Sequence, residues 1–492
     1  MTTRLLRVLF LLSLLAFTSA CTDQAAQNQE HAAERPPNII VIFSDDQGWA
    51  DLGAHGVAQD VRTPHLDRLA MDGVRFSSGY VTAPQCSPSR AGLLTGRYQQ
   101  RFGFGDIRQG PLPLGERTIA DRLSEAGYAT GMVGKWHLDP NPLTAKWAQG
   151  QGLKPRHNGR YAIPSVLRAP YLPGQRGFRE FFSGNDQQYL HNFDLSGNAL
   201  SAAGVSSRFP QGYRIDLQTE AALWFIKRNH HAPFFLYLAY FAPHVPLAAP
   251  PKYLERFPET MKTRRRYGLA MISAMDDGVG RIRELLERLG LTEDTLVFFI
   301  SDNGAPLGMH QRDLPVNNPR GAWDGSVNYP LNGEKGMLTE GGVRVPFLAA
   351  WPGMLPAGVL SDLPVSTLDV ASTAASAAGL QGAEDADGID LASILANKTL
   401  PPDRCLFWRF WGQSAVRCGR WKLIQLASGQ RFLFEIETHP QEQKNLVSVR
   451  PDVVRSLATK LEDWGASLLP PGLPDGDLNK QEVLWYSHYL SN

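Results

Sequence analysis

The sequence of 492 residues is poor in cysteine, in net charge and in long apolar runs. Its four cysteines can form at most two disulfides. Its 49 lysines and arginines balance 48 aspartates and glutamates. The chain therefore lacks the field that steers nucleic acids to proteins, and no nucleic-acid partner is expected. The apolar run at 8–17 is too short to span a bilayer, and no other stretch reaches that length.

The first residues have the pattern of a targeting segment. Arginines precede the apolar run, and small residues at 18–20 lead to Cys21, which predicts a signal peptide over 1–20. The small residues resemble a bacterial lipobox, although threonine replaces the usual leucine at position 18. We expect lipidation of Cys21, with ordinary secretion as the alternative, and a polar tether over 21–36. The expected location is the bacterial envelope, periplasm or outer membrane, with membrane contact only through the lipid.

Three apolar, β-branched or aromatic runs predict strands buried on both faces. They occupy 38–43, 234–241 and 296–300. Apolar residues at helical spacing over 119–126 and 271–289 predict helices between them. This alternation predicts an α/β fold, with a large, mixed but mostly parallel sheet between helices.

The pattern of predicted helices and strands changes near residue 370. Small residues over 371–382 predict a helix and a turn, antiparallel strands are expected at 415–423 and 430–436, and 451–464 predicts a closing helix. We therefore expect a catalytic domain over 37–370 and a smaller C-terminal α+β subdomain over 371–492. Cys405 and Cys418 flank a predicted hairpin and can pair in an oxidising compartment.

Acidic and amide residues follow two of the predicted strands. They are Asp45, Asp46, Asp302 and Asn303. Ligand sites in such sheets lie beyond the carboxyl ends of the strands, so these side chains are expected to meet. Three carboxylates would repel one another without a cation, and hard oxygen ligands suit calcium or magnesium better than zinc. The alternative is that they are only polar turn residues.

Cys86 begins the segment Cys-Ser-Pro-Ser-Arg-Ala-Gly-Leu-Leu-Thr-Gly, which opens a predicted helix. A helix N-terminus could make this cysteine more nucleophilic, and a buried structural cysteine is the alternative. The segment resembles the Cys-x-Pro-x-Arg signature of the type I sulfatases, in the alkaline phosphatase superfamily. A second signature of that family resembles 127–137, and further likeness extends from about 37 to 445, including 242–244, 333–336 and 340–346.

The resemblance implies an alkaline phosphatase-like fold and a role for each motif residue. Cys86 would be oxidised to formylglycine by a maturation enzyme. One calcium ion would be bound by Asp45, Asp46, Asp302, Asn303 and the modified Cys86. The hydrated aldehyde would attack sulfur and later expel sulfate. The remaining roles fall to basic residues: Arg90 stabilises the hydrate, Lys135 bridges it to sulfate, His137 is the base, and His244 and Lys335 contact sulfate and the leaving oxygen. Taken singly, these would be surface charges or structural histidines.

Two polar loops could shape the substrate site. The loop at 304–332 carries Trp323, which could stack on a sugar or simply pack on the loop. Asn317, Asn318 and Asp324 could bind sugar hydroxyls, and 184–192 is a similar loop. These features and the aromatic stretch 407–411 resemble polysaccharide sulfatases of marine and gut bacteria. The expected substrate is a sulfated carbohydrate, such as a galactan of the carrageenan type or a glycosaminoglycan.

Two other functions remain open from the sequence. The first is a phosphonate or phosphodiester hydrolase, because some superfamily members share the Cys-x-Pro-x-Arg motif. Members with two zinc ions need further histidine and aspartate ligands, which the surroundings of His244 do not supply. The second is a lipoprotein that binds sulfated glycans without cleaving them, which the complete set of motif residues disfavours.

Overall fold

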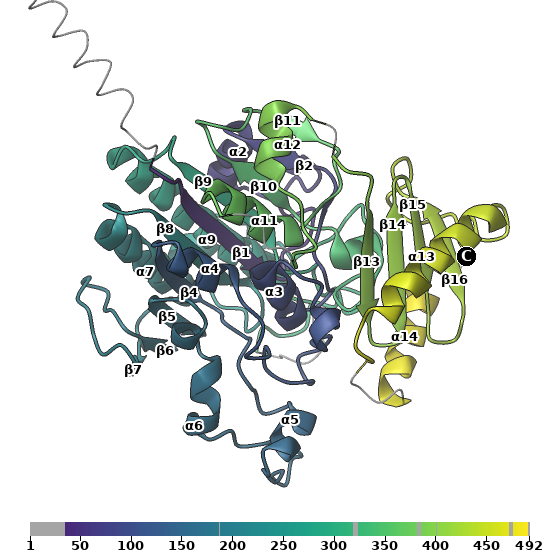
Figure 1. The fold of residues 1–492 in the computed structure, drawn as a ribbon, viewed down its shortest axis with the longest axis horizontal. Coiled ribbons are helices and arrows are strands. Elements are labelled where there is room, and N and C mark those ends of the chain that lie inside the picture. The colour runs from purple at the N-terminus through teal and green to yellow at the C-terminus, as the bar shows by residue number, and fades with distance from the viewer. Residues whose placement is uncertain are drawn as a thin grey trace, which may run out of the picture.

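A ten-stranded sheet forms the centre of the computed structural model (Figure 1). The structure describes residues 35–185, 187–317, 323–380, 385–399, 401–471 and 476–490. The predicted signal peptide, most of the tether, Cys21 and Asn318 lie outside the described residues. The strand order is β11-β2-β10-β9-β1-β8-β4-β5-β6-β7.

The middle of the sheet is parallel. Its strands are β9 (Thr295–Ser301), β1 (Asn38–Asp45), β8 (Phe234–Pro243), β4 (Ala129–Gly134) and β5 (Glu180–Asn185). β1 pairs in parallel with β8 and β9. β1, β8 and β9 are buried along their whole length, which explains why their sequences are nearly continuous apolar runs. The predicted mixed, mostly parallel sheet is confirmed.

Antiparallel strands flank this parallel centre. β10 (Phe347–Ala350) runs antiparallel to β9, and β6 (Gln188–His191) and β7 (Val205–Arg208) form the far edge. β2 (Val74–Phe76) and β11 (Val359–Ser361) form the other edge. A separate pair joins β3 (Gly79–Tyr80) to β12 (Val365–Ser366).

Helices cover both faces, because alternate side chains of β1 point to opposite sides. Ile40 and Ile42 lie in the core beneath α2 (Pro64–Met71), α7 (Arg214–Asn229), α8 (Pro251–Leu254) and α9 (Thr263–Arg288). Ile39, Val41 and Phe43 lie in the core shared with α3 (Cys86–Thr95), α4 (Ile119–Glu125), α11 (Leu368–Ala377) and α12 (Leu391–Asn397). Two short helices, α5 (Ala145–Gly150) and α6 (Ser165–Arg168), extend away from the sheet, and α10 (Glu340–Val343) follows the long loop (Figure 1).

The C-terminal part is a four-stranded antiparallel sheet with two helices. Its elements are β13 (Cys405–Phe410), β14 (Gln413–Cys418), β15 (Trp421–Gln425), β16 (Arg431–Glu435), α13 (Pro451–Ala466) and α14 (Gly476–Tyr489). The single strand expected at 415–423 is instead two strands, β14 and β15, because a turn at Gly419 reverses the chain. Cys405 and Cys418 face each other across β13 and β14 and form a disulfide.

The first two helices after residue 367 pack with the large part of the molecule. Helix α11 packs on α3 and α4 of the large layer, and α12 packs on α11. The small sheet begins at Cys405. Among the described residues, no helix has the length and apolar character to cross a membrane.

Candidate active site

The carboxyl ends of β1 and β9, which are neighbours in the sheet, supply the acidic side chains of the site. β1 ends at Asp45, and Asp46 follows with a φ of 67°, a left-handed conformation that aspartate adopts more readily than most residues. The backbone N–H of Asp46 donates to Asp302 Oδ1 at 3.0 Å. Asp45, Asp46 and Asp302 are all buried. The polar residues therefore meet at the edge of the sheet where the sequence predicts a ligand site.

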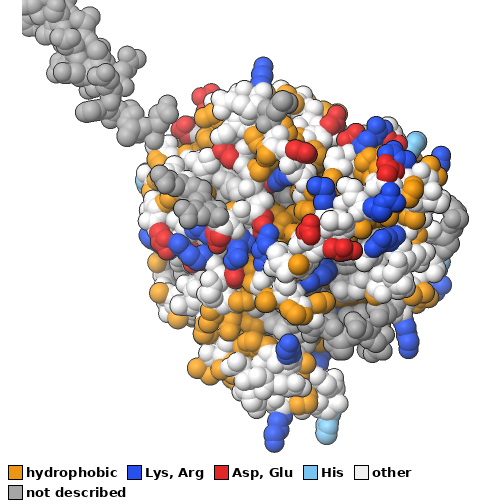
Figure 2. Space-filling view, turned by 45° about the vertical axis from the view of Figure 1, so that its right-hand side comes forward, with side chains coloured by type: hydrophobic (Ala, Val, Ile, Leu, Met, Phe, Trp, Pro, Cys, Tyr) orange, Lys and Arg blue, Asp and Glu red, His pale blue; other side chains and the backbone are white. Residues whose placement is uncertain are grey.

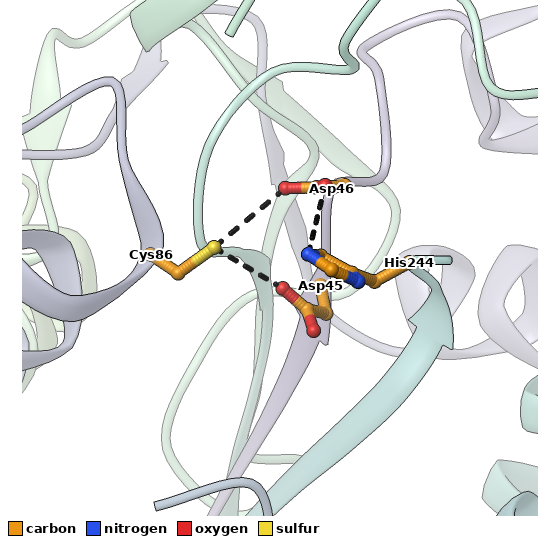
Figure 3. Close-up of side chains that lie close together, drawn as sticks. All are labelled: Asp45, Asp46, Cys86 and His244. Carbon is orange, nitrogen blue, oxygen red and sulfur yellow. Dashed lines mark hydrogen bonds and ion pairs between the residues drawn. The ribbon is translucent and has the colours of Figure 1, made fainter. Parts of the chain in front are cut away.

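Cys86, the first residue of α3, faces Asp45 and Asp46 (Figure 3). It is present as the unmodified thiol, so its Sγ marks where an oxygen on the same Cβ would lie after conversion. Sγ is 3.4 Å from Asp45 Oδ1, 3.8 Å from Asp46 Oδ1 and 3.2 Å from Lys335 Nζ. Burial, together with the charge of Asp302, raises the pKa of the thiol. The helix N-terminus therefore does not leave the unmodified residue as a thiolate.

Each carboxylate of the site is paired with a basic side chain. Lys135 Nζ donates to both oxygens of Asp45, at 2.8 and 2.7 Å. Lys335 Nζ donates to both oxygens of Asp46, at 2.6 and 2.8 Å. Arg90 Nη2 donates to Asp302 Oδ2 at 2.6 Å. The expectation that the carboxylates would repel one another without a cation is therefore wrong, because three basic groups already balance them.

Asn303 nevertheless completes a set of ligands that fits a divalent cation. Its Nδ2 donates to Asp46 Oδ1 at 2.6 Å, while its buried Oδ1 has no hydrogen-bond partner among the described residues. An unsatisfied buried oxygen costs free energy, and a cation would satisfy it. Burial and the charge of Asp45 raise the pKa of Asp302 to about 6, which a nearby cation would reverse. Carboxylate and amide oxygens are the ligands that calcium and magnesium prefer.

Two histidines lie beside this cluster. The Ser87 hydroxyl donates to the carbonyl oxygen of His137 at 2.8 Å, which holds His137 next to the start of α3. Burial, with Lys135, lowers the pKa of His137 well below its usual value, so the ring is neutral at pH 7. His244 Nε2 lies 3.6 Å from Asp46 Oδ2 (Figure 3). Burial likewise lowers the pKa of His244, to about 4.

Comparison with known proteins identifies the family. The family model described as Sulfatase matches residues 37–380. The chain is 33% identical over 410 residues to N-acetylgalactosamine-6-sulfatase of Mus musculus, a match that covers 79% of this chain and 72% of that protein. It is 35% identical over 417 residues to arylsulfatase A of Homo sapiens, a match that covers 80% of this chain and 75% of that protein. The chain belongs to the sulfatase family.

A solved structure is similar over almost its whole length. The crystal structure of Ps i-CgsB in complex with k-i-k-neocarrahexaose has a TM-score of 0.72 and 28% sequence identity, and the match covers 92% of this chain and 98% of that one. This sulfatase is therefore a sulfuric ester hydrolase with the alkaline phosphatase-like fold that its motifs imply. The predicted family, fold and enzyme class are confirmed.

The long loop of this sulfatase does not present the sugar platform expected from its sequence. Trp323 is only 3% exposed, packs with Ala305 and Leu307, and donates its indole N–H to Ser326 O at 2.6 Å. The predicted stacking of Trp323 on a sugar is therefore wrong, because its ring packs inside the loop. Asp324 is also fully buried and accepts from the backbone N–H of Ser326 at 3.0 Å, while its Oδ2 has no hydrogen-bond partner among the described residues, so its contact with a sugar stays a prediction.

The other two aromatic or polar segments are mainly structural. In the stretch 407–411, Trp408 is buried and donates to Val81 O at 2.6 Å, and Phe407 stacks on Trp464. In the loop 184–192, both ring nitrogens of His191 are bonded, to Phe193 O at 2.7 Å and to a serine hydroxyl at 2.8 Å. Of the residues expected to bind sugar, Asn317 is exposed.

Sequence reasoning missed Tyr237, which lies in the middle of the apolar strand β8. Its hydroxyl accepts from Arg90 Nη1 at 3.2 Å, and Arg90 also lies over the ring of Phe43. These contacts hold a completely buried guanidinium beside Asp302. A tyrosine hydroxyl within an apolar strand needs a polar partner, and that was the available signal.

Proposed function

We propose that this sulfatase hydrolyses sulfate esters of a carbohydrate, using formylglycine derived from Cys86 and one calcium ion. The observation that carries the proposal is the position of Cys86 Sγ. It lies within 3.4 Å of Asp45 Oδ1 and 3.2 Å of Lys335 Nζ. A group on the Cβ of residue 86 would therefore meet both a ligand of the cation and a charged donor. The hydrated aldehyde, once formed, supplies two hydroxyls, one to attack sulfur and one to expel sulfate afterwards.

Asp45, Asp46, Asp302 and Asn303 are the residues that would hold calcium. Bound there, the ion supplies positive charge that lowers the pKa of a hydroxyl and neutralises sulfate oxygens. Three carboxylates and three basic side chains already balance, so a divalent cation gives the site a net positive charge. That excess suits an anionic sulfate ester entering a buried site.

Some of the basic residues act on the nucleophile, and others act on the sulfate. Arg90 is fixed by Asp302 and Tyr237, so it can orient a hydrate at position 86 without rearrangement. Lys135 and Lys335 carry the charges that face sulfate. His137 is neutral and has a buried Nδ1 without a partner among the described side chains, which leaves it free to accept a proton.

The substrate class rests on the similar proteins. N-acetylgalactosamine-6-sulfatase and the structure complexed with k-i-k-neocarrahexaose both have carbohydrates in their descriptions, which favours a sulfated sugar here. A galactan or glycosaminoglycan type is our proposal within that class. A phosphonate or phosphodiester hydrolase is the second candidate, because the same cluster could stabilise a phosphoryl group.

Maturation and location are further parts of the proposal. Conversion of Cys86 to an aldehyde requires a formylglycine-generating enzyme. Lipidation of Cys21 would anchor the protein to the bacterial envelope, and replacing Cys21 with alanine should then release it into the soluble fraction. Uncleaved protein in the cytosol would contradict this location.

The decisive experiment joins mass spectrometry to a substrate panel. The Cys86 peptide should carry the mass of formylglycine, and the purified protein should hydrolyse sulfated saccharides faster than matched phosphate or phosphonate esters. Cys86→Ala is the control, which should stay folded and lose turnover. An unmodified Cys86 in an active enzyme, or full activity of Cys86→Ala, would refute the mechanism. Faster turnover of phosphonate esters would favour the second candidate.

A further inference from the structure

Residues 140–175 form a projecting lobe with charge of one sign only. This segment, which contains α5 and α6, has no aspartate or glutamate, although such residues number 48 in the chain. It contains five lysines and arginines. The lobe extends below the sheet in Figure 1, and the lower projection in Figure 2 carries blue and pale-blue side chains but no red ones. We call it the basic lobe.

The charges of the basic lobe are exposed and largely unpaired. Lys146, Lys154, Arg156 and Arg160 are exposed, and none of them has an ion pair within the described part of the chain. Only Arg168 is paired, with Asp139 just outside the lobe. The protein as a whole is nearly neutral, with 49 lysines and arginines against 48 aspartates and glutamates. The lobe is therefore a local positive surface that the overall charge conceals.

The basic lobe lies at the same edge of the sheet as the active site. It follows β4, whose carboxyl end leads to Lys135 and His137. At its base, Asn141 Nδ2 donates to the carbonyl oxygen of Ile107 at 2.9 Å. The N–H of Ile107 in turn donates to Gln85 Oε1 at 3.1 Å, and Gln85 directly precedes Cys86. One loop thus joins the lobe to the start of the helix that carries the nucleophile.

Packing at its base makes the basic lobe a fixed platform. Trp147 packs edge-to-face on Tyr171, with ring centroids 5.8 Å apart. The carbonyl oxygen of Tyr171 accepts from the indole of Trp136 at 2.8 Å. Tyr161 is buried and accepts from Gln149 at 2.9 Å. The exposed charges are therefore held on a folded support beside the site.

We propose that the basic lobe binds sulfated units of the substrate chain that lie outside the active site, so that the preferred substrate is a polyanionic carbohydrate rather than an isolated sulfated sugar. This inference rests on the proposed function. Its basis is charge complementarity, because a chain with several sulfate groups places negative charges at intervals, and a surface with only positive charges near the catalytic residues attracts them. Such binding should weaken as salt increases, because salt screens exposed charges and competes as counterions.

The test removes the four unpaired charges and measures binding without relying on catalysis. The lobe variant carries Lys146→Gln, Lys154→Gln, Arg156→Gln and Arg160→Gln. A matched variant removes the same numbers of exposed lysines and arginines away from the lobe: Arg62→Gln, Lys444→Gln, Arg455→Gln and Lys460→Gln. Both are made in the full-length Cys86→Ala protein, and binding of fluorescein-labelled dextran sulfate is followed by anisotropy, with uncharged dextran as the blank.

The lobe variant should bind dextran sulfate roughly tenfold more weakly at low salt, since each exposed charge contact contributes about twofold. The matched variant should change by about twofold or less, and the dependence of binding on salt should be shallower only for the lobe variant. Equal losses in the two variants, or none in the lobe variant, would overturn the proposal. Equally tight binding of duplex DNA at the same charge concentration would overturn its choice of a sulfated carbohydrate.

A second measurement separates this inference from the proposed reaction. In the active protein, dextran sulfate should inhibit hydrolysis of 4-nitrocatechol sulfate, and the lobe substitutions should raise the inhibition constant but leave the uninhibited rate unchanged. A slower uninhibited rate in the lobe variant would mean that the lobe supports the site itself, against the proposal. If formylglycine-containing wild-type protein hydrolysed no sulfate ester, the proposed reaction would fail, and the binding comparison would still decide the role of the lobe.

Discussion

Replacing Lys335 with alanine should slow hydrolysis of a sulfated sugar far more than hydrolysis of an activated aryl sulfate. A sugar alkoxide needs a proton as it leaves, whereas a nitrophenolate needs little help. Lys335 Nζ lies 3.2 Å from Cys86 Sγ and on both oxygens of Asp46. Burial alone would lower the pKa of Lys335, but the neighbouring negative charges, Asp46 first, raise it well above its usual value. The donor is therefore protonated and close to the reacting position.

His244, the other residue expected at the leaving oxygen, is less suited to donate. Its Nδ1 meets the carbonyl oxygen of Val245, which can only accept, so Nδ1 carries the proton of the neutral ring. Its pKa of about 4 means that Nε2 has no proton at pH 7 in most molecules. His244→Ala should then reduce turnover of both substrate types by a similar factor.

The size of the effect follows from general acid catalysis, which contributes about a hundredfold to ten-thousandfold. Lys335→Ala should lower the ratio of kcat/KM for sugar sulfate over aryl sulfate by at least about a hundredfold, or about 2.7 kcal/mol. Lys335→Arg is the matched control, because it keeps a positive charge that can bind sulfate but presents it on a larger, planar group that does not place a donor where the lysine ammonium lies. It should recover aryl turnover more than sugar turnover.

The assay is steady-state kinetics of each variant on one sugar sulfate and one nitrophenyl or nitrocatechol sulfate, at equal formylglycine content. Equal losses on both substrates for Lys335→Ala would refute the reasoning. A loss confined to the sugar for His244→Ala would return the donor role to that histidine.

Three further outcomes test the site and its support. Removing calcium with a chelator should lower the melting temperature, because an ion at about a hundred times its Kd adds about 2.7 kcal/mol to the free energy of unfolding. Asp302→Asn should abolish this calcium dependence. An unchanged melting temperature with verified metal loss would count against the site. Lys422 is fully buried and donates to Glu340 at 2.7 Å, with Glu442 3.1 Å away. Lys422→Met should therefore lower the free energy of unfolding in urea by about 3–5 kcal/mol, because it leaves buried carboxylates without their partner, and adding Glu442→Gln should restore part of that stability. The Cys405–Cys418 disulfide closes a loop with a sequence separation of 13, so replacing both residues with serine should lower the free energy of unfolding by up to about 3 kcal/mol. An unchanged urea midpoint would show that the disulfide adds no stability.

The sequence by itself determined the family, the central strands and the identity of the residues that meet at the sheet edge. Apolar runs at 38–43, 234–241 and 296–300 became β1, β8 and β9, because strands buried on both faces leave a continuous local pattern. Asp45 and Asp302 could be placed together because the carboxyl ends of parallel strands lie at one edge. Such signals are local, so they can be read without knowing which segments touch.

Only the tertiary structure decided how charges and aromatic rings are used. The ion pair of Lys335 with Asp46 joins residues 289 positions apart, and with the pairs made by Lys135 and Arg90 it balances the carboxylates, against the repulsion expected from their placement at one sheet edge. The burial of Trp323 depends on Ala305 and Leu307 folding around it, which no pattern near the tryptophan encodes. The role proposed for the basic lobe likewise depends on its position near Gln85 and Cys86, because electrostatic attraction depends on distance through space and not along the chain.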